Sequence, residues 1–104
     1  MKFPLNLMIK KTDKIAVIGA SMDEDKYGYK VSVNLIERGY DVYLINPRKG
    51  QILGHEFHRR LMDTSTDIDL AVFVVPPEVG IKIVEQVKDL NIPKVWLQPG
   101  SESS

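Results

Sequence analysis

Four short apolar runs constrain the fold of this chain more than any other feature of its sequence. They cover residues 14–19, 41–45, 70–75 and 94–97, and apolar residues within them are nearly continuous rather than alternating with polar ones. Continuous runs of this length are typical of strands that are covered on both faces, as in a parallel sheet. The sequence therefore predicts an α/β fold in which helices connect the strands.

Helical spacing indicates what connects two pairs of these runs. Residues 28–38 carry apolar side chains on one face and end before Gly39, a usual stop signal for a helix. A second helix is expected to begin at Pro76 and Pro77, and its apolar stripe continues to Leu90. Alternating strands and helices with right-handed crossovers predict a Rossmann-like three-layer fold with a mainly parallel sheet.

The region between the second and third apolar runs is less regular. We interpret it as a short edge strand near residues 55–58, followed by an irregular or briefly helical crossover. With that strand counted third along the chain, the expected strand order is 3-2-1-4-5.

Length and composition limit the domain organisation and the class of partner. The 104 residues suit a single domain, with residues 1–12 as a leader or a short helix that begins at Pro4. The formal net charge of zero argues against a nucleic-acid partner, and no apolar run reaches the roughly 20 residues that a membrane span needs. The sequence has no cysteine, which excludes thiolate chemistry and favours a cytoplasmic location.

A glycine-containing turn follows the first run. Gly19, Ala20 and Ser21 precede a charged loop, and Gly28 opens the predicted helix. Glycine lets the backbone approach a phosphate closely, and the free amides of a helix start can donate to its oxygens, aided by the serine hydroxyl. The pattern is a degenerate relative of the dinucleotide fingerprint G-x-G-x-x-G. A tight turn that binds no ligand is the alternative.

The loop after the second run narrows the choice of nucleotide. NAD sites usually have an acidic residue there for the ribose hydroxyls, whereas this chain has Asn46 and Pro47 followed by Arg48 and Lys49. Positive charge suits a phosphorylated ribose, as in NADP or coenzyme A. The residues leave both ligands open, and a solvated basic turn is the alternative.

Short stretches along the chain strengthen one of these choices. In chain order they read IAVIGAS at 15–21, KYGYKV at 26–31, GYDVY at 39–43, INP at 45–47, LG at 53–54, DLAV at 69–72, VVPP at 74–77 and VWLQPG at 95–100. Taken together they resemble the small CoA-binding proteins related to the nucleotide-binding domain of succinyl-CoA synthetase α subunits.

The resemblance implies a site with three groups of cofactor-binding residues. The pyrophosphate would lie on the turn and helix start formed by Gly19, Ala20, Ser21, Lys26, Tyr27 and Gly28. The adenosine phosphate would meet Asn46, Pro47, Arg48 and Lys49. The pantetheine side would be lined by Val75, Pro76 and Pro77.

One departure from the family concerns the end of the chain. Family members usually continue past the Gln-Pro-Gly turn with another helix and a final strand, and this chain stops at Ser104. The strand that carries Trp96 is then expected to be a sheet edge, which a homodimer or another partner chain would cover. Alternatively, the chain is a shortened form of a longer protein.

No set of residues in the sequence forms a catalytic constellation. His55 and His58 would point to opposite faces of a strand and make a poor metal pair. The acidic residues 23–25 are expected to face solvent, with Lys26 turned inward. The sequence thus predicts a non-catalytic module that binds CoA or an acyl-CoA. Its alternatives are an NADP-dependent oxidoreductase, the nucleotide-binding subunit of an acyl-CoA ligase, and a ligand-sensing partner protein.

Overall fold

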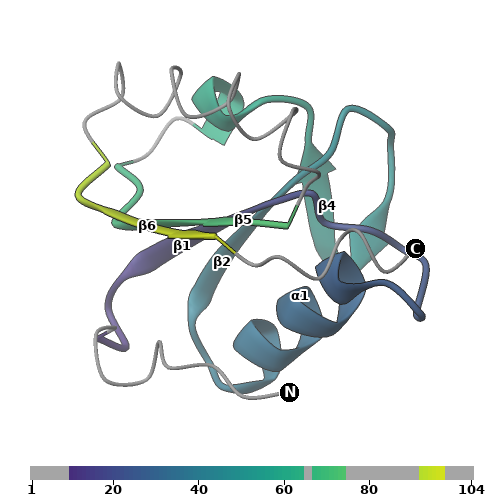
Figure 1. Cartoon of the computed structure of the whole chain (residues 1–104), viewed down its shortest axis with the longest axis horizontal. Helices are drawn as coiled ribbons and strands as arrows, with labels where there is room; N and C mark the ends of the chain where they lie inside the picture. The colour runs from purple at the N-terminus through teal and green to yellow at the C-terminus, as the bar shows by residue number, and fades with distance from the viewer. Residues whose placement is uncertain (1–9, 65–66, 75–91, 98–104) are drawn as a thin grey trace.

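A computed structural model describes residues 10–64, 67–74 and 92–97, and it forms one twisted sheet with helices beside it (Figure 1). The elements in chain order are β1 (Lys14–Ile18), α1 (Tyr27–Glu37), β2 (Asp41–Ile45), β3 (Gln51–Ile52), β4 (His55–His58), the 3-10 helix η2 (Leu61–Thr64), β5 (Leu70–Phe73) and β6 (Lys94–Leu97). The helices predicted to begin at Pro4 and at Pro76 lie outside the described residues.

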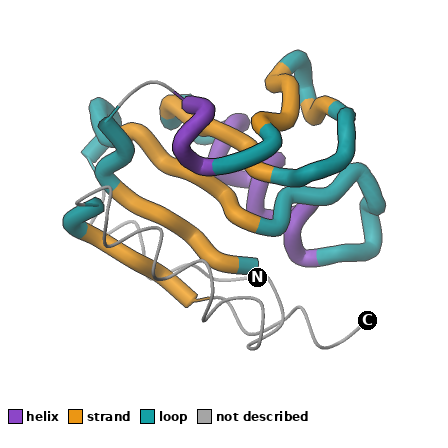
Figure 2. Tube along the Cα trace, turned by 90° about the horizontal axis from the view of Figure 1, so that it is seen from above, coloured by secondary structure: helices purple, strands orange, loops and turns teal. Residues whose placement is uncertain are grey.

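The strands follow the order β3-β4-β2-β1-β5-β6. All neighbouring pairs are parallel except β3 and β4, which form an antiparallel hairpin. Figure 2 shows the strands lying side by side in one layer. The predicted α/β fold with a mainly parallel sheet is confirmed. The strand order differs in one detail, because the two-residue strand β3 extends the sheet beyond β4.

The hairpin turn between β3 and β4 contains two residues with positive φ. Leu53 has a φ of 50° and Gly54 a φ of 85°. Two successive left-handed residues match the twist of a tight hairpin, but leucine is an unusual choice for the first of them. A two-residue strand has no sequence period, so the apolar pattern could not predict β3.

The core has one apolar layer on each face of the sheet. On one face, Val31 and Leu35 of α1 pack with Ile15 and Val17 of β1. The second layer contains Phe73, and Figure 1 shows η2 on this side of the sheet, opposite α1. Burial on both faces explains why the strand sequences are continuously apolar.

Polar contacts hold together the amino ends of three parallel strands. The Asp69 carboxylate accepts a hydrogen bond of 2.8 Å from the backbone N–H of Lys14. The ammonium of Lys94 lies 3.2 Å from the Asp13 carboxylate, which also accepts a bond of 3.0 Å from the backbone N–H of Lys10. These contacts occupy the edge of the sheet opposite the ends of the strands that carry the predicted site.

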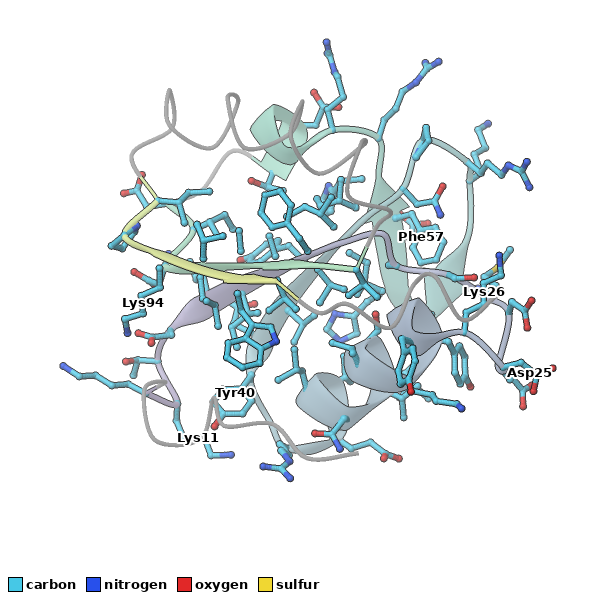
Figure 3. The ribbon with its side chains drawn as sticks, in the orientation of Figure 1. Lys11, Asp25, Lys26, Tyr40, Phe57 and Lys94 are labelled. Atoms are coloured by element: carbon cyan, nitrogen blue, oxygen red, sulfur yellow. The ribbon has the colours of Figure 1, made fainter. Side chains whose placement is uncertain are left out.

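Figure 3 shows this separation. Lys94, Lys11 and Tyr40 lie at one end of the molecule, and Phe57 and Lys26 lie at the other. The Lys11 ammonium donates to the carbonyl of Arg38 at the end of α1 and lies 4.4 Å from the centre of the Tyr40 ring.

Candidate functional site

The turn after β1, residues 19–21 (called the β1 turn below), begins with a glycine in a conformation that disfavours side chains. Gly19 has a φ of 99°, and its backbone N–H donates to the carbonyl of Ile45 at 3.2 Å. The bond ties the β1 turn to the end of β2. In parallel sheets, loops at the carboxyl ends of adjacent strands are the usual place for a ligand.

The start of α1 packs directly on the β1 turn. A Cβ added to Gly28 would lie 2.1 Å from the carbonyl oxygen of Gly19 and 3.2 Å from the backbone nitrogen of Ser21. Only glycine allows the helix to come so close. The amino end of the helix is therefore held beside the backbone of the β1 turn.

Among the described residues, no side chain caps this end of α1. Lys26 occupies the N-cap position without a side-chain hydrogen bond to the helix, and the first turn has no acidic residue. The amides of Tyr29 and Lys30 donate to the carbonyl of Lys26, whereas those of Tyr27 and Gly28 precede the first helical bonds. Uncapped amides and the positive end of the helix dipole favour an anion here.

The loop between the β1 turn and α1 is ordered by its own polar groups. The Ser21 hydroxyl oxygen accepts the N–H of Asp23 at 3.0 Å, and the Asp23 carboxylate accepts the N–H of Asp25 at 3.0 Å. Residues 23–25 are exposed, as expected from the sequence. Lys26 is exposed as well, so its side chain is not buried in the fold, and its predicted turn toward a phosphate stays a prediction. Since the Ser21 oxygen is the acceptor in this bond, its O–H can still donate a hydrogen bond to a ligand.

Tyr27 has a packing role at the start of α1. Its half-buried ring packs against the core on the α1 face, and the ammonium of Lys30 lies 5.7 Å from the ring centre. The contacts fix the ring beside the helix start.

Asn46 joins three segments of the candidate site. Its side-chain N–H donates to the carbonyl of Ala20 at 2.6 Å, and its side-chain oxygen accepts the backbone N–H of Arg48 at 2.8 Å. Its own backbone N–H donates to the carbonyl of His58 at 2.9 Å. The residue predicted to meet the ligand therefore also holds the loop after β2 against the β1 turn.

The predicted basic residues lie at the same end of the sheet as the β1 turn. Pro47, Arg48 and Lys49 follow β2 and are all exposed. We call residues 46–49 the β2 corner. The structure thus brings two of the three predicted groups, the β1 turn and the β2 corner, to adjacent strand ends.

An apolar contact that sequence reasoning missed also links these two loops. A Cβ on Gly50 would lie 2.8 Å from the Met22 sulfur and 3.0 Å from the Phe57 ring, so the Met22 side chain lies over Gly50. Met22 remains 55% exposed. The sequence offered one signal for this contact, the glycine at position 50. That glycine alone did not indicate that Met22 would be the residue packed on it.

The third predicted group, Val75, Pro76 and Pro77, lies outside the described residues. Val74 immediately precedes it and donates its backbone N–H to the carbonyl of Ile18 at 2.7 Å. The described end of β5 is thereby held beside the end of β1.

The two histidines serve local contacts. The His55 ring nitrogen Nδ1 lies 3.2 Å from the carbonyl of Val42, and the His58 ring packs at 6.0 Å from the Tyr43 ring. In residues 10–64, 67–74 and 92–97, no group of three or more His, Asp or Glu side chains is arranged to hold a metal ion. Among the same residues, no helix is long and apolar enough to span a membrane.

Comparison with known families gives the family of this chain and the class of its ligand. The profile of the CoA binding domain matches residues 13–104. The chain belongs to the family of CoA binding domains. The predicted resemblance and the choice of coenzyme A are confirmed, and the uncapped helix end beside the β1 turn agrees with a ligand that carries phosphates.

Curated relatives of this CoA-binding domain include much longer proteins. An ADP-forming acetate–CoA ligase from Methanocaldococcus jannaschii is 42% identical over 72 residues, which is 69% of this chain and 10% of the ligase. The α subunit of ADP-forming acetate–CoA ligase I from Pyrococcus furiosus is 36% identical over 78 residues, 69% of this chain and 17% of the subunit. The chain thus spans only a small part of these relatives.

Solved structures share the same fold. A conserved hypothetical protein from Pyrococcus furiosus has a TM-score of 0.78 at 36% identity, covering 86% of this chain and 77% of that protein. A dinucleotide-forming acetyl-coenzyme A synthetase from Ca. Korarchaeum cryptofilum has a TM-score of 0.74 at 28% identity, covering 80% of this chain and 18% of the synthetase.

Proposed function

We propose that this chain binds CoA or an acyl-CoA with its pyrophosphate on the β1 turn, and that it performs no chemistry on its own. The observation that carries the proposal is the contact between Gly28 and the carbonyl of Gly19, which holds the uncapped amino end of α1 beside that turn. The amides of Ala20, Ser21, Tyr27 and Gly28 would donate to the pyrophosphate oxygens, with the Ser21 hydroxyl as a further donor.

The phosphate on the ribose of CoA would meet the β2 corner. Arg48 and Lys49 are exposed there, and no ion pair occupies either side chain within the described residues. Both ends of the Asn46 side-chain amide are hydrogen-bonded, one to Ala20 and the other to Arg48. We therefore assign Asn46 to positioning the β2 corner as well as to contact with the ligand. Pro47 fixes the backbone between them. Lys26, exposed at the helix start, would add charge beside the pyrophosphate.

The pantetheine arm would run toward Val75, Pro76 and Pro77. This part of the proposal rests on their sequence position directly after Val74, which the structure places beside the end of β1. An acyl group at the end of the arm would then lie outside the part of the site that the described residues form.

Binding specificity tests the proposal. Calorimetric titration of the whole chain with CoA, dephospho-CoA, NAD and NADPH should give the tightest binding for CoA, with NAD at least about tenfold weaker because the β2 corner is basic. Tightest binding of NADPH would contradict the proposal and support an NADP-dependent oxidoreductase instead.

A pair of glycine variants tests the position of the pyrophosphate. Gly19 and Gly39 both have positive φ, at 99° and 88°, so alanine strains the backbone at either position. Gly39 follows α1 at the end remote from the β1 turn, and a Cβ there would meet no atom of the described residues within 4 Å. Gly19→Ala should abolish CoA binding, whereas Gly39→Ala should lower stability and leave affinity unchanged. Equal affinity in both folded variants would show that the ligand lies elsewhere.

A second candidate is the nucleotide-binding part of an acyl-CoA ligase. It is favoured by the ADP-forming acetate–CoA ligases among the relatives, which are longer than this chain. On this proposal the chain works in the cytoplasm and binds a partner chain that supplies the catalytic residues. Copurification of tagged chain with a protein that confers ADP-forming ligase activity would support it.

We also propose that β6 is an interface. This strand stands last in the order of the described sheet, and Val95 on it is 46% exposed. A homodimer formed through β6 is the simplest closed arrangement. Light scattering that gives the mass of a monomer throughout the micromolar range would contradict the homodimer and leave a different partner chain as the cover.

A further inference from the structure

The ends of β2 and β4 bring a second pair of basic residues close to the β2 corner. These strands are parallel, with Ile45 opposite His58, and the backbone N–H of Asn46 donates to the carbonyl of His58 at 2.9 Å. Arg59 directly follows the residue that accepts this bond, and Arg60 comes next. The two arginines therefore leave the sheet beside the point where the β2 corner begins.

The two arginines differ in their local partners. Arg60 pairs with Asp63 at the start of the next helix, with its guanidinium nitrogen 3.3 Å from the carboxylate and a second bond of 3.4 Å from Nε. Arg59 is exposed, and no hydrogen bond or ion pair involves its side chain among the described residues. One positive charge at this edge is thus compensated locally and the other is not.

The residues around the two arginines lie on both faces of the sheet. Phe57 packs against the core layer that contains Ala20 of the β1 turn, whereas His58 packs against Tyr43 on the opposite face. Arg60 meets Asp63 of η2, and Figure 1 shows η2 on the side of the sheet away from α1. Arg59 lies between His58 and Arg60, in the bend that directly follows β4, so it leaves the sheet at the strand ends that also carry the β2 corner.

We propose that Arg59 is a specificity-determining residue that acts with Arg48 and Lys49 on the ribose phosphate of CoA. A phosphate monoester carries a charge of about −1.5 to −2 near neutral pH on three acceptor oxygens, so several cations can bind it at once. The guanidinium adds a planar fork of donors that suits phosphate oxygens. This inference rests on the proposed function and adds to it a residue from a third strand end.

The test compares CoA with dephospho-CoA, which lacks only the ribose phosphate. Calorimetric titration gives the ratio of their affinities for the unchanged chain, Arg59→Gln and Arg60→Gln at one ionic strength. Arg59→Gln should weaken CoA binding by about fivefold and dephospho-CoA binding by less than about twofold, since the arginine would bind the ribose phosphate alone. Arg60→Gln, the matched control, should leave the ratio unchanged because Asp63 already holds that side chain.

Arg59→Lys provides a second readout that does not depend on loss of charge. Lysine keeps the positive charge but lacks the fork of donors, so this variant should recover part of the discrimination. Recovery would show that charge at this position, and not a disturbed fold, sets the ratio.

The outcomes separate this inference from the proposed function. If the unchanged chain binds CoA and dephospho-CoA equally, the assignment of the β2 corner to the ribose phosphate fails, and the role of Arg59 fails with it. If the unchanged chain discriminates and Arg59→Gln discriminates as strongly, only the role of Arg59 is overturned. The role of Arg59 would also be overturned if Arg60→Gln lowered the ratio of CoA to dephospho-CoA affinity as much as Arg59→Gln does. Any positive charge at these strand ends would then have the same effect.

Discussion

The side-chain amide of Asn46 donates a hydrogen bond of 2.6 Å to the carbonyl of Ala20, 26 residues earlier in the chain. The bond joins the loop after β2 to the β1 turn, and the other end of the same amide accepts the N–H of Arg48. One side chain therefore helps to set the distance between the proposed pyrophosphate and ribose-phosphate sites, together with the bond from the Gly19 N–H to the Ile45 carbonyl.

Asn46→Asp should destabilise the chain and weaken CoA binding. The substitution keeps an acceptor for Arg48 but replaces the donor to Ala20 by a carboxylate oxygen that faces a carbonyl. Leaving a buried acceptor without its hydrogen-bond donor costs about 1–3 kcal/mol. Urea unfolding measures the stability and titration measures the affinity. Although the change restores the acidic residue typical of NAD sites, it should not create NAD binding. An unfolding midpoint equal to that of the parent would contradict this role for Asn46.

Gly28→Ala should separate the helix from the β1 turn. The new Cβ would lie 2.1 Å from the Gly19 carbonyl oxygen, a backbone atom that cannot rotate away. We expect a loss of about 1–3 kcal/mol in the free energy of unfolding, as in other overpacked sites, and much weaker CoA binding.

Gly50→Ala is the matched control for Gly28→Ala. Its Cβ would meet the Met22 sulfur at 2.8 Å and the Phe57 ring at 3.0 Å. The exposed Met22 side chain can move, so the stability loss should stay below about 1 kcal/mol. Thermal unfolding measures both stability losses. A larger loss in Gly50→Ala than in Gly28→Ala would contradict the claim that the close approach of α1 to the β1 turn requires glycine.

The parallel strands could be predicted from the sequence, whereas the β3–β4 hairpin with its turn at residues 53 and 54 could not. The apolar runs predicted the parallel strands because burial on both faces leaves a continuous pattern. The strand β3 left no such pattern: it has two residues, and its turn uses Leu53 at a φ of 50°. Its formation follows from the turn geometry and from pairing with β4, neither of which is local to the two residues.

The candidate site was predictable to a similar extent. Glycines and basic residues at strand ends identified the β1 turn and the β2 corner. The internal bonds of Asn46 and the difference between Arg59 and Arg60 were not predictable, because they depend on the register of β2 against β4 and on the position of Asp63. The pantetheine group and the second predicted helix fall outside the described residues and stay predictions.

Leu53→Asn should stabilise the chain. Leucine at positive φ is strained, whereas asparagine adopts this conformation readily and is favoured at this place in two-residue hairpins. Leu53 is 57% exposed, so little apolar burial is lost. We expect a gain of about 0.5–1 kcal/mol in the free energy of unfolding. Gly54→Ala, which adds strain at a φ of 85°, should shift the unfolding midpoint in the other direction. A destabilised Leu53→Asn would show that the leucine contributes packing that outweighs its strain.

Asp13 and Lys94 should make stability depend on pH in the acidic range. The hydrogen bond from the backbone N–H of Lys10 lowers the pKa of Asp13 below its ordinary value of 3.8; burial opposes this shift, and the nearby Lys94 ammonium adds to it. Because the folded-state pKa lies below the unfolded one, the carboxylate stabilises the fold fully above the unfolded pKa. The contribution is then lost as the pH falls through the folded pKa.

Asp13→Asn removes this contribution and keeps an oxygen that can accept the N–H of Lys10. At about pH 7 the variant should be less stable than the parent by about 1 kcal/mol, and the difference should shrink as the pH falls below the ordinary carboxyl pKa of 3.8 and through the lower pKa of the folded state. Urea unfolding of both proteins across this range measures it. The double variant with Lys94→Gln isolates the pair, since a coupled pair gives losses that do not add. A stability difference that stays constant down to the lowest pH would mean that the charge of Asp13 does not hold the amino ends of β1 and β6 together.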